Sequence, residues 1–248
     1  MKGLITVIAI LAAWQISSLA GLNPYILPAP WDILLAFIDS IADGSLLTHS
    51  WSSFQRVGVG IIIACIVSVP MAITLSLSRT LRDFFLPVIE GLRPVPPIAW
   101  IPVAILWFGV RGNEGAYFIV FIASFFPLFI NTFTAVGHIE PIHINAARAL
   151  GAGRRYIITD VAIPSALPYL ITGLRISIGV GWMSLIAAEM VVSYQGTGLG
   201  YMFQLNRDVN NPADVMVNTV TIGLIGYLMN ALILQIEKRL LLWHQVQN

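Results

Sequence analysis

Six long apolar runs divide this chain, and they constrain its fold more than any other feature of the sequence. A bilayer core about 30 Å thick needs roughly 20 apolar residues per helical crossing, and a helix satisfies its own backbone polar groups in lipid. Only 10% of the 248 residues are charged, against about 25% in soluble domains. We therefore predict an all-α polytopic membrane protein, with about six transmembrane helices in a single domain over residues 1–248. The predicted spans are residues 4–20, 57–77, 84–109, 115–136, 164–192 and 214–236.

The first run is followed by a short amphipathic segment. Run 4–20 is similar to a signal peptide, because Ser18 and Ala20 are small residues at a position where a peptidase would cut. Since the chain keeps Met1, we interpret the run as a first span. Residues 31–41 place Asp32 and Asp39 on one side of a helix and apolar residues on another. This pattern predicts a helix that lies along the membrane surface.

The third run contains a proline break, Pro94-Val95-Pro96-Pro97. Prolines lack the N–H that continues a helix, and their rings clash with the preceding turn. Broken backbone at membrane depth persists only where protein buries it or where it lines a cavity. Glu90 and Arg93 flank the break and could pair with each other at i, i+3. Alternatively, the two charges and Pro94, Pro96 and Pro97 form part of a gate.

The fifth run carries two charges and a ridge of small residues. Arg175 and Glu189 lie within about 40° of each other around a helix and roughly 21 Å apart along it. Ionisable residues within a span are costly and are therefore functional candidates. For Arg175 we weigh a contact with solute against a structural bond to a backbone carbonyl, and for Glu189 a bond to backbone or tyrosine. Gly173, Ser177 and Gly181 form a small-residue ridge suited to close helix packing.

The basic residues orient the spans, because cytoplasmic loops carry an excess of Lys and Arg. With both termini in the cytoplasm, eight basic residues fall inside and three fall outside. The inner set is Lys2, Arg79, Arg82, Arg148, Arg154, Arg155, Lys238 and Arg239, and the outer set is Arg56, Arg111 and Arg207. This orientation places the polar segment 145–164 in the cytoplasm.

Several kinds of chemistry have no motif here. The chain lacks the GxxxxGK[ST] phosphate-binding loop and the HExxH zinc motif. Its single cysteine, Cys65, excludes a disulfide framework. We expect no catalytic residue, no metal and no nucleic-acid partner. Residues 196–200 read GTGLG, and we interpret them as a turn. A phosphate-binding loop would need a basic residue or a helix start after it, and we predict neither.

The polar segment 145–164 reads NAARALGAGRRYIITDVAIP. Pro141 suits the first turn of a helix and Gly151 suits its end. Small alanines between them would allow the helix to sit deep in a partner's groove, and arginines would bond carboxylates at its rim. From the residues alone, a solvated loop with positive-inside arginines is an equal alternative.

The spacing of this segment resembles the cytoplasmic EAA loop of permease subunits in ATP-binding-cassette importers. In that family, Glu-Ala-Ala, three residues, Gly, nine residues and Ile-x-Leu-Pro form a coupling helix seated in the ATPase subunit. Asn145 stands in place of the family's Glu, and Val161 and Ile163 replace its Ile and Leu. The resemblance implies a type I importer permease fold with a coupling loop at about residues 138–163. Its ATPase-coupling residues would be Asn145, Ala146, Ala147, Arg148, Gly151, Arg154, Arg155 and Pro164.

Further segments resemble one branch of the binding-protein-dependent permeases, which imports nitrate, sulfonate, taurine and bicarbonate. They are residues 27–30, 93–102, 107–109 and 187–190. The resemblance implies a multi-pass permease subunit in the bacterial inner membrane that passes a small anion or zwitterion and catalyses no covalent reaction. It also implies a homodimer surrounded by lipid, with two ATPase subunits and an extracellular solute-binding protein. ATP-Mg would bind to the ATPase partner, and this chain would hold no cofactor.

Two other function classes stay open as rivals. An ATP-independent secondary transporter would favour inverted repeats and ion ligands near the midplane, and we find no convincing repeat. An intramembrane enzyme would need a nucleophile beside a base, and no such constellation is visible. Co-purification of an ATPase subunit separates the importer from the secondary transporter.

Overall fold

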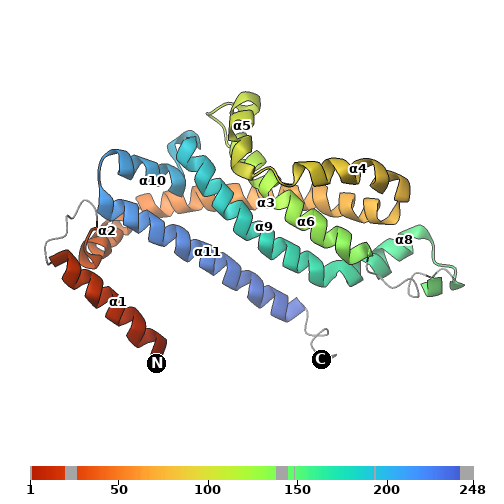
Figure 1. Cartoon of the computed structure of the whole chain (residues 1–248), viewed down its shortest axis with the longest axis horizontal. Coiled ribbons are helices and arrows are strands. Elements are labelled where there is room, and N and C mark those ends of the chain that lie inside the picture. Colours follow the sequence, from red (N-terminus) through yellow and green to blue (C-terminus); the bar gives the residue numbers. More distant parts are fainter. Residues whose placement is uncertain (1, 20–26, 138–144, 148, 193, 241–248) are drawn as a thin grey trace. The chain divides into compact units, whose positions relative to one another are not determined.

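The structure is a computed structural model, and it describes residues 2–19, 27–137, 145–147, 149–192 and 194–240. The elements assigned within these ranges are helices, which confirms the all-α prediction (Figure 1). They are α1 (Lys2–Leu19), α2 (Pro30–Ala42), α3 (Ser45–Leu77), α4 (Arg79–Leu92), η1 (Pro97–Trp100), α5 (Ile101–Phe108), α6 (Glu114–Gly137), α8 (Arg154–Tyr156), η2 (Ile157–Ala162), α9 (Ile163–Val191), η3 (Tyr194–Gly196), α10 (Leu199–Asp208) and α11 (Pro212–Leu240).

Four helices in the described part of the chain are long and apolar enough to cross a membrane. They lie within Ser45–Leu77, Glu114–Gly137, Leu167–Val191 and Pro212–Arg239. Two further helices, Arg79–Leu92 and Pro97–Phe108, pass the same test together as one bent pair, the broken span, with a 95° bend at the proline break. The predicted spans 57–77, 115–136, 164–192 and 214–236 are therefore confirmed, whereas a full crossing by residues 84–109 stays a prediction. The first run lies in α1, and its crossing stays a prediction.

Helix α3 begins at Ser45, well before the predicted start of the second span at residue 57. Polar side chains in this added part bond back to the helix itself: the Thr48 hydroxyl donates to the Gly44 carbonyl at 2.9 Å and the Ser52 hydroxyl to the Thr48 carbonyl at 3.0 Å. The hydroxyls of these two residues are therefore satisfied by the backbone one turn back. Arg56, which is predicted to lie on the outer side, belongs to this added part of α3, and its side of the membrane stays a prediction.

Asp43 stabilises the start of α3. Its carboxylate accepts a hydrogen bond from the Ser45 N–H at 2.8 Å. Hydrogen bonds from the Ser45 side chain and backbone hold the pKa of Asp43 below its ordinary value. The carboxylate is therefore charged near the positive end of the helix dipole, where a negative charge is favourable.

The chain divides into two compact units. The first comprises Met1–Gln55, Val110–Gly112 and Ile186–Ile225, and the second comprises Arg56–Gly109, Asn113–Leu185 and Gly226–Asn248. The prediction of one domain over residues 1–248 stays a prediction. In the first unit, the Trp31 N–H of α2 donates to the Gln15 side chain of α1 at 3.2 Å. Trp31 and Ile38 of α2 expose their apolar side chains, as expected for a helix at a membrane surface.

In the second unit, α6 and α9 pack closely through the predicted small-residue ridge. The Ser177 hydroxyl donates to the Ser124 carbonyl at 2.9 Å, and the Ser124 hydroxyl donates to the Ser177 carbonyl at 3.2 Å. A Cβ atom on Gly173 would lie 2.9 Å from the Asn131 Cβ, and one on Gly181 would lie 2.8 Å from the Ser124 Oγ. The ridge is therefore confirmed as a helix-packing face.

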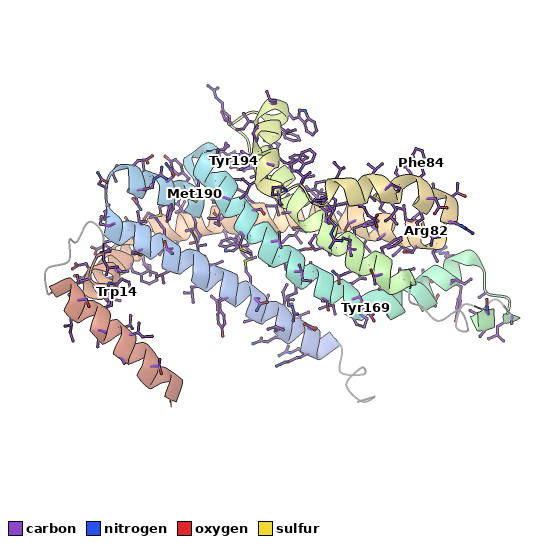
Figure 2. All side chains as sticks on the ribbon, viewed as in Figure 1. Trp14, Arg82, Phe84, Tyr169, Met190 and Tyr194 are labelled. Atoms are coloured by element: carbon purple, nitrogen blue, oxygen red, sulfur yellow. The ribbon has the colours of Figure 1, made fainter. Side chains whose placement is uncertain are left out.

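Both halves of the broken span are attached to α6. Ile89 of α4 is buried in a cluster with Ala72, Leu75 and Phe129. In α5, the Trp107 ring lies 5.5 Å from the Phe118 ring of α6 in a T-shaped contact, and such aromatic pairs add about 0.5–1.5 kcal/mol beyond burial. Figure 2 shows Phe84 projecting outward from α4, where its side chain is exposed. The two halves are thus fixed on one helix while the backbone between them is broken.

The close approach of α6 and α9 predicts a position-specific effect of side-chain size. We expect Gly173→Val to destabilise the protein by about 1–3 kcal/mol, because overpacking a close contact has this cost. Gly179→Val is the matched control on the same helix, since a Cβ there meets nothing within 4 Å. The thermal unfolding midpoint of each variant in detergent measures the effect, and equal midpoints would contradict the packing assignment.

Candidate functional site

The predicted coupling segment contains a helix that ends at Gly151. The Leu150 N–H donates to the Ala146 carbonyl at 3.1 Å, and the Ala152 N–H donates to the Ala147 carbonyl at 2.9 Å. Gly151 has a φ of +84°. The bond from Ala152 to Ala147 and the left-handed glycine between them form a Schellman C-cap. The predicted role of Gly151 as the end of this helix is therefore confirmed, whereas Pro141 and Arg148 lie outside the described residues.

Small side chains and one apolar side chain form most of the described surface of residues 145–151. Asn145, Ala146 and Ala149 are exposed and Ala147 is half-buried. Leu150 is 89% exposed, and the sequence analysis did not single it out. Its position among the three residues between Ala147 and Gly151 could have identified it as part of the coupling surface. An apolar side chain this exposed beside small residues is suited to burial in a partner protein.

After the turn at residues 150–153, the chain is helical from Arg154 into α9. The backbone of Arg154 begins α8, the π-helix η2 follows, and Pro164 is the second residue of α9. A π-helix is rare and often marks a functional site. Arg155 is exposed and makes no ion pair with another described residue. The coupling roles of Asn145, Arg154, Arg155 and Pro164 stay predictions.

The proline break leaves no backbone donor unsatisfied. The Arg93 N–H donates to the Ile89 carbonyl at 3.0 Å and the Val95 N–H donates to the Leu92 carbonyl at 3.1 Å. Pro94, Pro96 and Pro97 have no N–H to satisfy. The sequence therefore removes the very donors that a 95° bend would otherwise leave without partners.

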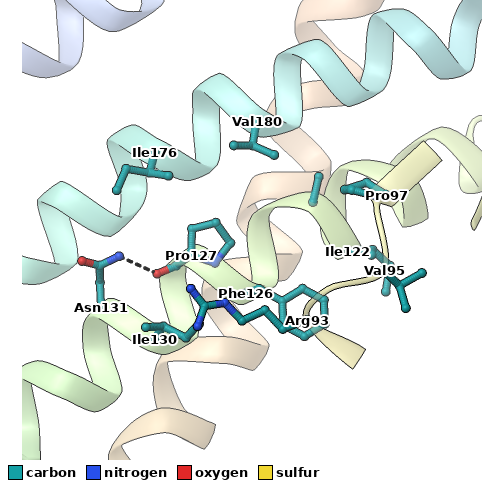
Figure 3. A pocket seen from close by; sticks show the side chains of 11 residues that line it. Arg93, Val95, Pro97, Ile122, Phe126, Pro127, Ile130, Asn131, Ile176 and Val180 are labelled. Carbon is teal, nitrogen blue, oxygen red and sulfur yellow. Dashed lines mark hydrogen bonds between the residues drawn. The ribbon is translucent and has the colours of Figure 1, made fainter. Parts of the chain in front are cut away.

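The predicted ion pair between Glu90 and Arg93 is wrong: no hydrogen bond or ion pair joins them in the described structure, and both are exposed. The reason is local, because α4 ends at Leu92 and Arg93 lies at the start of the break. Arg93 instead lines a pocket of about 300 Å³ (Figure 3). The other lining residues are Val95 and Pro97 of the break; Ile122, Ala123, Phe126, Pro127, Ile130 and Asn131 of α6; and Ile176 and Val180 of α9.

Arg175 is bound by a carboxylate of α11. Its Nη1 lies 3.4 Å from the Glu237 Oε2, and both side chains are half-buried. A structural bond was the preferred interpretation of Arg175, although its partner is a side chain and not the expected backbone carbonyl. The pair balances the charge of Arg175 within its span.

Glu189 is 1% exposed, and it binds the start of α10. The Ser53 hydroxyl lies 2.8 and 3.0 Å from its two carboxylate oxygens, and the Gly200 N–H donates to it at 3.1 Å. The Leu199 N–H donates to the Ser53 Oγ at 2.9 Å, and the Gly198 N–H donates to the His49 Nδ1 at 3.0 Å. The expectation that Glu189 bonds to backbone is confirmed.

This arrangement corrects the interpretation of residues 196–200. We expected no helix start after them, but α10 begins at Leu199. The N–H groups of Gly198, Leu199 and Gly200 all point to side chains of the same unit. A buried carboxylate therefore occupies the position where a helix N-terminus could bind an external anion.

The sequence analysis also missed a second polar group. Arg56 is 2% exposed, and its Nε donates to the Asn113 Oδ1 at 2.9 Å. His49, Ser53 and Arg56 follow each other at helical spacing, so extending α3 toward the amino terminus would have revealed them as one face. Elsewhere in the described residues, no three His, Cys, Asp or Glu side chains gather where they could hold a metal ion.

Comparisons with known proteins agree on one family. The family model described as binding-protein-dependent transport system inner membrane component matches residues 56–241. The taurine transport system permease protein TauC of Escherichia coli is 32% identical over 93% of this chain and 85% of its own length. The bicarbonate transport system permease protein CmpB of Synechococcus elongatus is 31% identical over 95% of this chain and 87% of its own length.

A solved structure supports the same fold. A chain titled as an inward facing conformation of the MetNI methionine ABC transporter aligns with a TM-score of 0.70 and 19% identity. The alignment covers 79% of this chain and 95% of that one. At this identity it supports the fold alone, and the permease fold implied by the resemblance is confirmed.

The buried Glu189 cluster predicts a stability effect. We expect Glu189→Ala to destabilise the protein by about 1–3 kcal/mol or more, because the buried Gly200 N–H and Ser53 hydroxyl lose their acceptor. Glu189→Gln keeps one acceptor oxygen and should recover part of this loss. Thermal unfolding in detergent measures both variants. Glu90→Ala, on an exposed carboxylate, is the control and should be neutral; a Glu189→Ala variant as stable as this control would contradict the assignment.

Proposed function

Because this chain belongs to the family of binding-protein-dependent transport system inner membrane components, we propose that it forms the membrane path of an ATP-driven importer for a small anion or zwitterion. The solute would be of the nitrate, bicarbonate, sulfonate or taurine type. Relatives named for taurine and bicarbonate transport cover nearly the whole chain. The chain itself is a multi-pass transport subunit.

The observation that carries the coupling part of the proposal is the helix that ends at Gly151. It lies between α6 and α9, its described surface is small, and Leu150 is 89% exposed. A helix of this kind can insert into a groove of a separate ATPase subunit. We infer that ATP-Mg binds to that subunit, and that its closure moves α6 and α9 through their direct connections to this segment.

The path itself requires two halves, and one chain supplies one half. We infer two copies of this chain, two ATPase subunits and an extracellular solute-binding protein, with lipid around the spans. Both termini would lie in the cytoplasm. Arg56, Arg111 and Arg207 would be the outer basic residues, against the same inner set. Transport then proceeds by alternating access, with the broken span as the segment that changes conformation.

The charges in the spans favour passage over tight binding. Arg175 is balanced by Glu237, and Glu189 is enclosed by donors. A path that bound an anion tightly would release it slowly. We therefore assign solute selection mainly to the binding protein.

The coupling proposal predicts that Gly151→Val and Ala147→Glu reduce uptake about tenfold or more. A left-handed φ costs an L-residue about 1–2 kcal/mol, and a charged side chain at Ala147 prevents close insertion. The measurement combines solute uptake with co-purification of the ATPase subunit, at equal amounts of permease in the membrane. Gly153→Val is the matched control, since Gly153 is exposed, lacks a positive φ and has open space around it. Uptake at the wild-type level in both variants contradicts the proposal, and absence of any ATPase contradicts the importer function.

Because Arg175 has a structural ion pair, we predict that its loss affects the structure and does not change which solute is transported. We expect Arg175→Gln to lower uptake modestly and Glu237→Gln to lower it by a similar factor, because each removes the same pair. Exchange of the binding protein for a relative of different specificity should change the transported solute far more. Competition between two labelled solutes measures the preference, and a switch caused by Arg175→Gln alone would place a selective site in α9.

A further inference from the structure

Arg93 is a guanidinium in a broken membrane span that makes no hydrogen bond or ion pair with any described residue. Charged side chains in membrane segments are costly and usually have partners. Two arginines of other long apolar helices follow this rule: Arg175 pairs with Glu237, and Arg56 donates to Asn113. Arg93 therefore presents its donors to whatever enters the pocket it lines.

The pocket combines this cation with mostly apolar walls. Figure 3 shows Arg93 extending from the break toward the part of α6 that carries Ile130 and Asn131. Asn131 also lines the pocket; one of its amide N–H groups donates to the Pro127 carbonyl at 2.8 Å, and the amide carries a second N–H. None of the lining residues is acidic.

The size and lining of the pocket select a class of ligand. Its volume of about 300 Å³ is at the lower end of the range of about 300–1,000 Å³ that holds small organic molecules. A guanidinium binds a planar pair of oxyanion oxygens through two parallel N–H donors. A bare inorganic anion would satisfy the guanidinium but leave Ile122, Ile176 and Val180 without an apolar partner.

We propose that this pocket is a transit subsite for a small organic oxyanion that carries an apolar substituent, such as an alkanesulfonate. Arg93 binds the oxyanion, Asn131 donates beside it, and the isoleucines and valine contact the alkyl chain. The proposal rests on the proposed import function, and it narrows the solute class of that function to organic anions. Binding is weak, since a solute in transit must also leave.

The test measures protection of a cysteine in the pocket. Val95→Cys, which lines the pocket, and Ile98→Cys, which is exposed on the same break but outside the pocket, are each made in a Cys65→Ser background. The assembled importer is placed in phosphatidylcholine nanodiscs and labelled with a neutral maleimide. Butane-1-sulfonate is the probe, and sodium nitrate at equal concentration is the comparison.

We expect butane-1-sulfonate at about four times its Kd to slow labelling of Val95→Cys roughly fivefold, because the unoccupied fraction falls to about one fifth. Labelling of Ile98→Cys should not change, and nitrate should protect neither position. Arg93→Gln should abolish the protection and Arg93→Lys should retain part of it. Arg79→Gln, on an exposed arginine at the start of the same α4 helix, should retain it fully. An unchanged rate of Ile98→Cys labelling shows that the Arg93 variants keep the fold of the break.

Three results overturn the subsite. They are absence of protection by butane-1-sulfonate, equal protection by nitrate, and protection that survives Arg93→Gln. A lipid phosphate could meet the same guanidinium, so a further arm adds phosphatidylglycerol to the nanodiscs. Protection by phosphatidylglycerol without protection by butane-1-sulfonate assigns the pocket to lipid and also overturns the proposal. If the ATPase co-purifies and solute is imported while Val95 stays unprotected, the import function stands and the subsite alone fails.

Discussion

The reciprocal hydrogen bonds between Ser124 and Ser177 bring α6 and α9 together, and the rest of the second unit depends on that closeness. In lipid, two helices gain little from the hydrophobic effect when they associate, so packing and interhelical hydrogen bonds carry the contact. Gly173 and Gly181 allow the approach, because a side chain at either position would meet α6. Once α6 is fixed, it supports both halves of the broken span and forms one wall of the pocket with Arg93.

The proline break and the start of α10 both satisfy their backbone N–H groups, but by different means. At the proline break, the sequence removes backbone donors, and the remaining N–H groups find carbonyls one turn back. At the start of α10, the donors remain, and Ser53, His49 and Glu189 accept from them. Both solutions satisfy backbone N–H groups, as is required at membrane depth. They leave the Arg93 guanidinium without a hydrogen-bond or ion-pair partner among the described residues, which makes the pocket that it lines a candidate binding site.

The sequence predicted the features that depend on local chemistry. The spans follow from apolar length, the break from three prolines, and the end of the coupling helix from Gly151, whose left-handed φ is a property of glycine. The early start of α3 was missed, because the polar residues between Ser45 and Arg56 look like a loop until their bonds to the same helix are seen. The cluster around Glu189 and the pair of Arg175 with Glu237 were beyond prediction, since each joins residues far apart in the sequence. The coupling contacts themselves involve a second protein and stay predictions.

The length of α3 bears on the bilayer in which this protein works. Its 33 residues extend about 50 Å at 1.5 Å per residue, whereas the hydrocarbon layer is about 30 Å thick. The amino-terminal third of α3 therefore stands beyond one face of the hydrocarbon when the apolar part is immersed. Membranes differ in thickness by a few ångströms, and a helix without such an extension must tilt or deform the lipid. Arg56 is only 2% exposed, so the helical turn at the boundary exposes no charge to the acyl chains. Helix α3 can therefore shift along the membrane normal and tolerate hydrophobic mismatch at little cost.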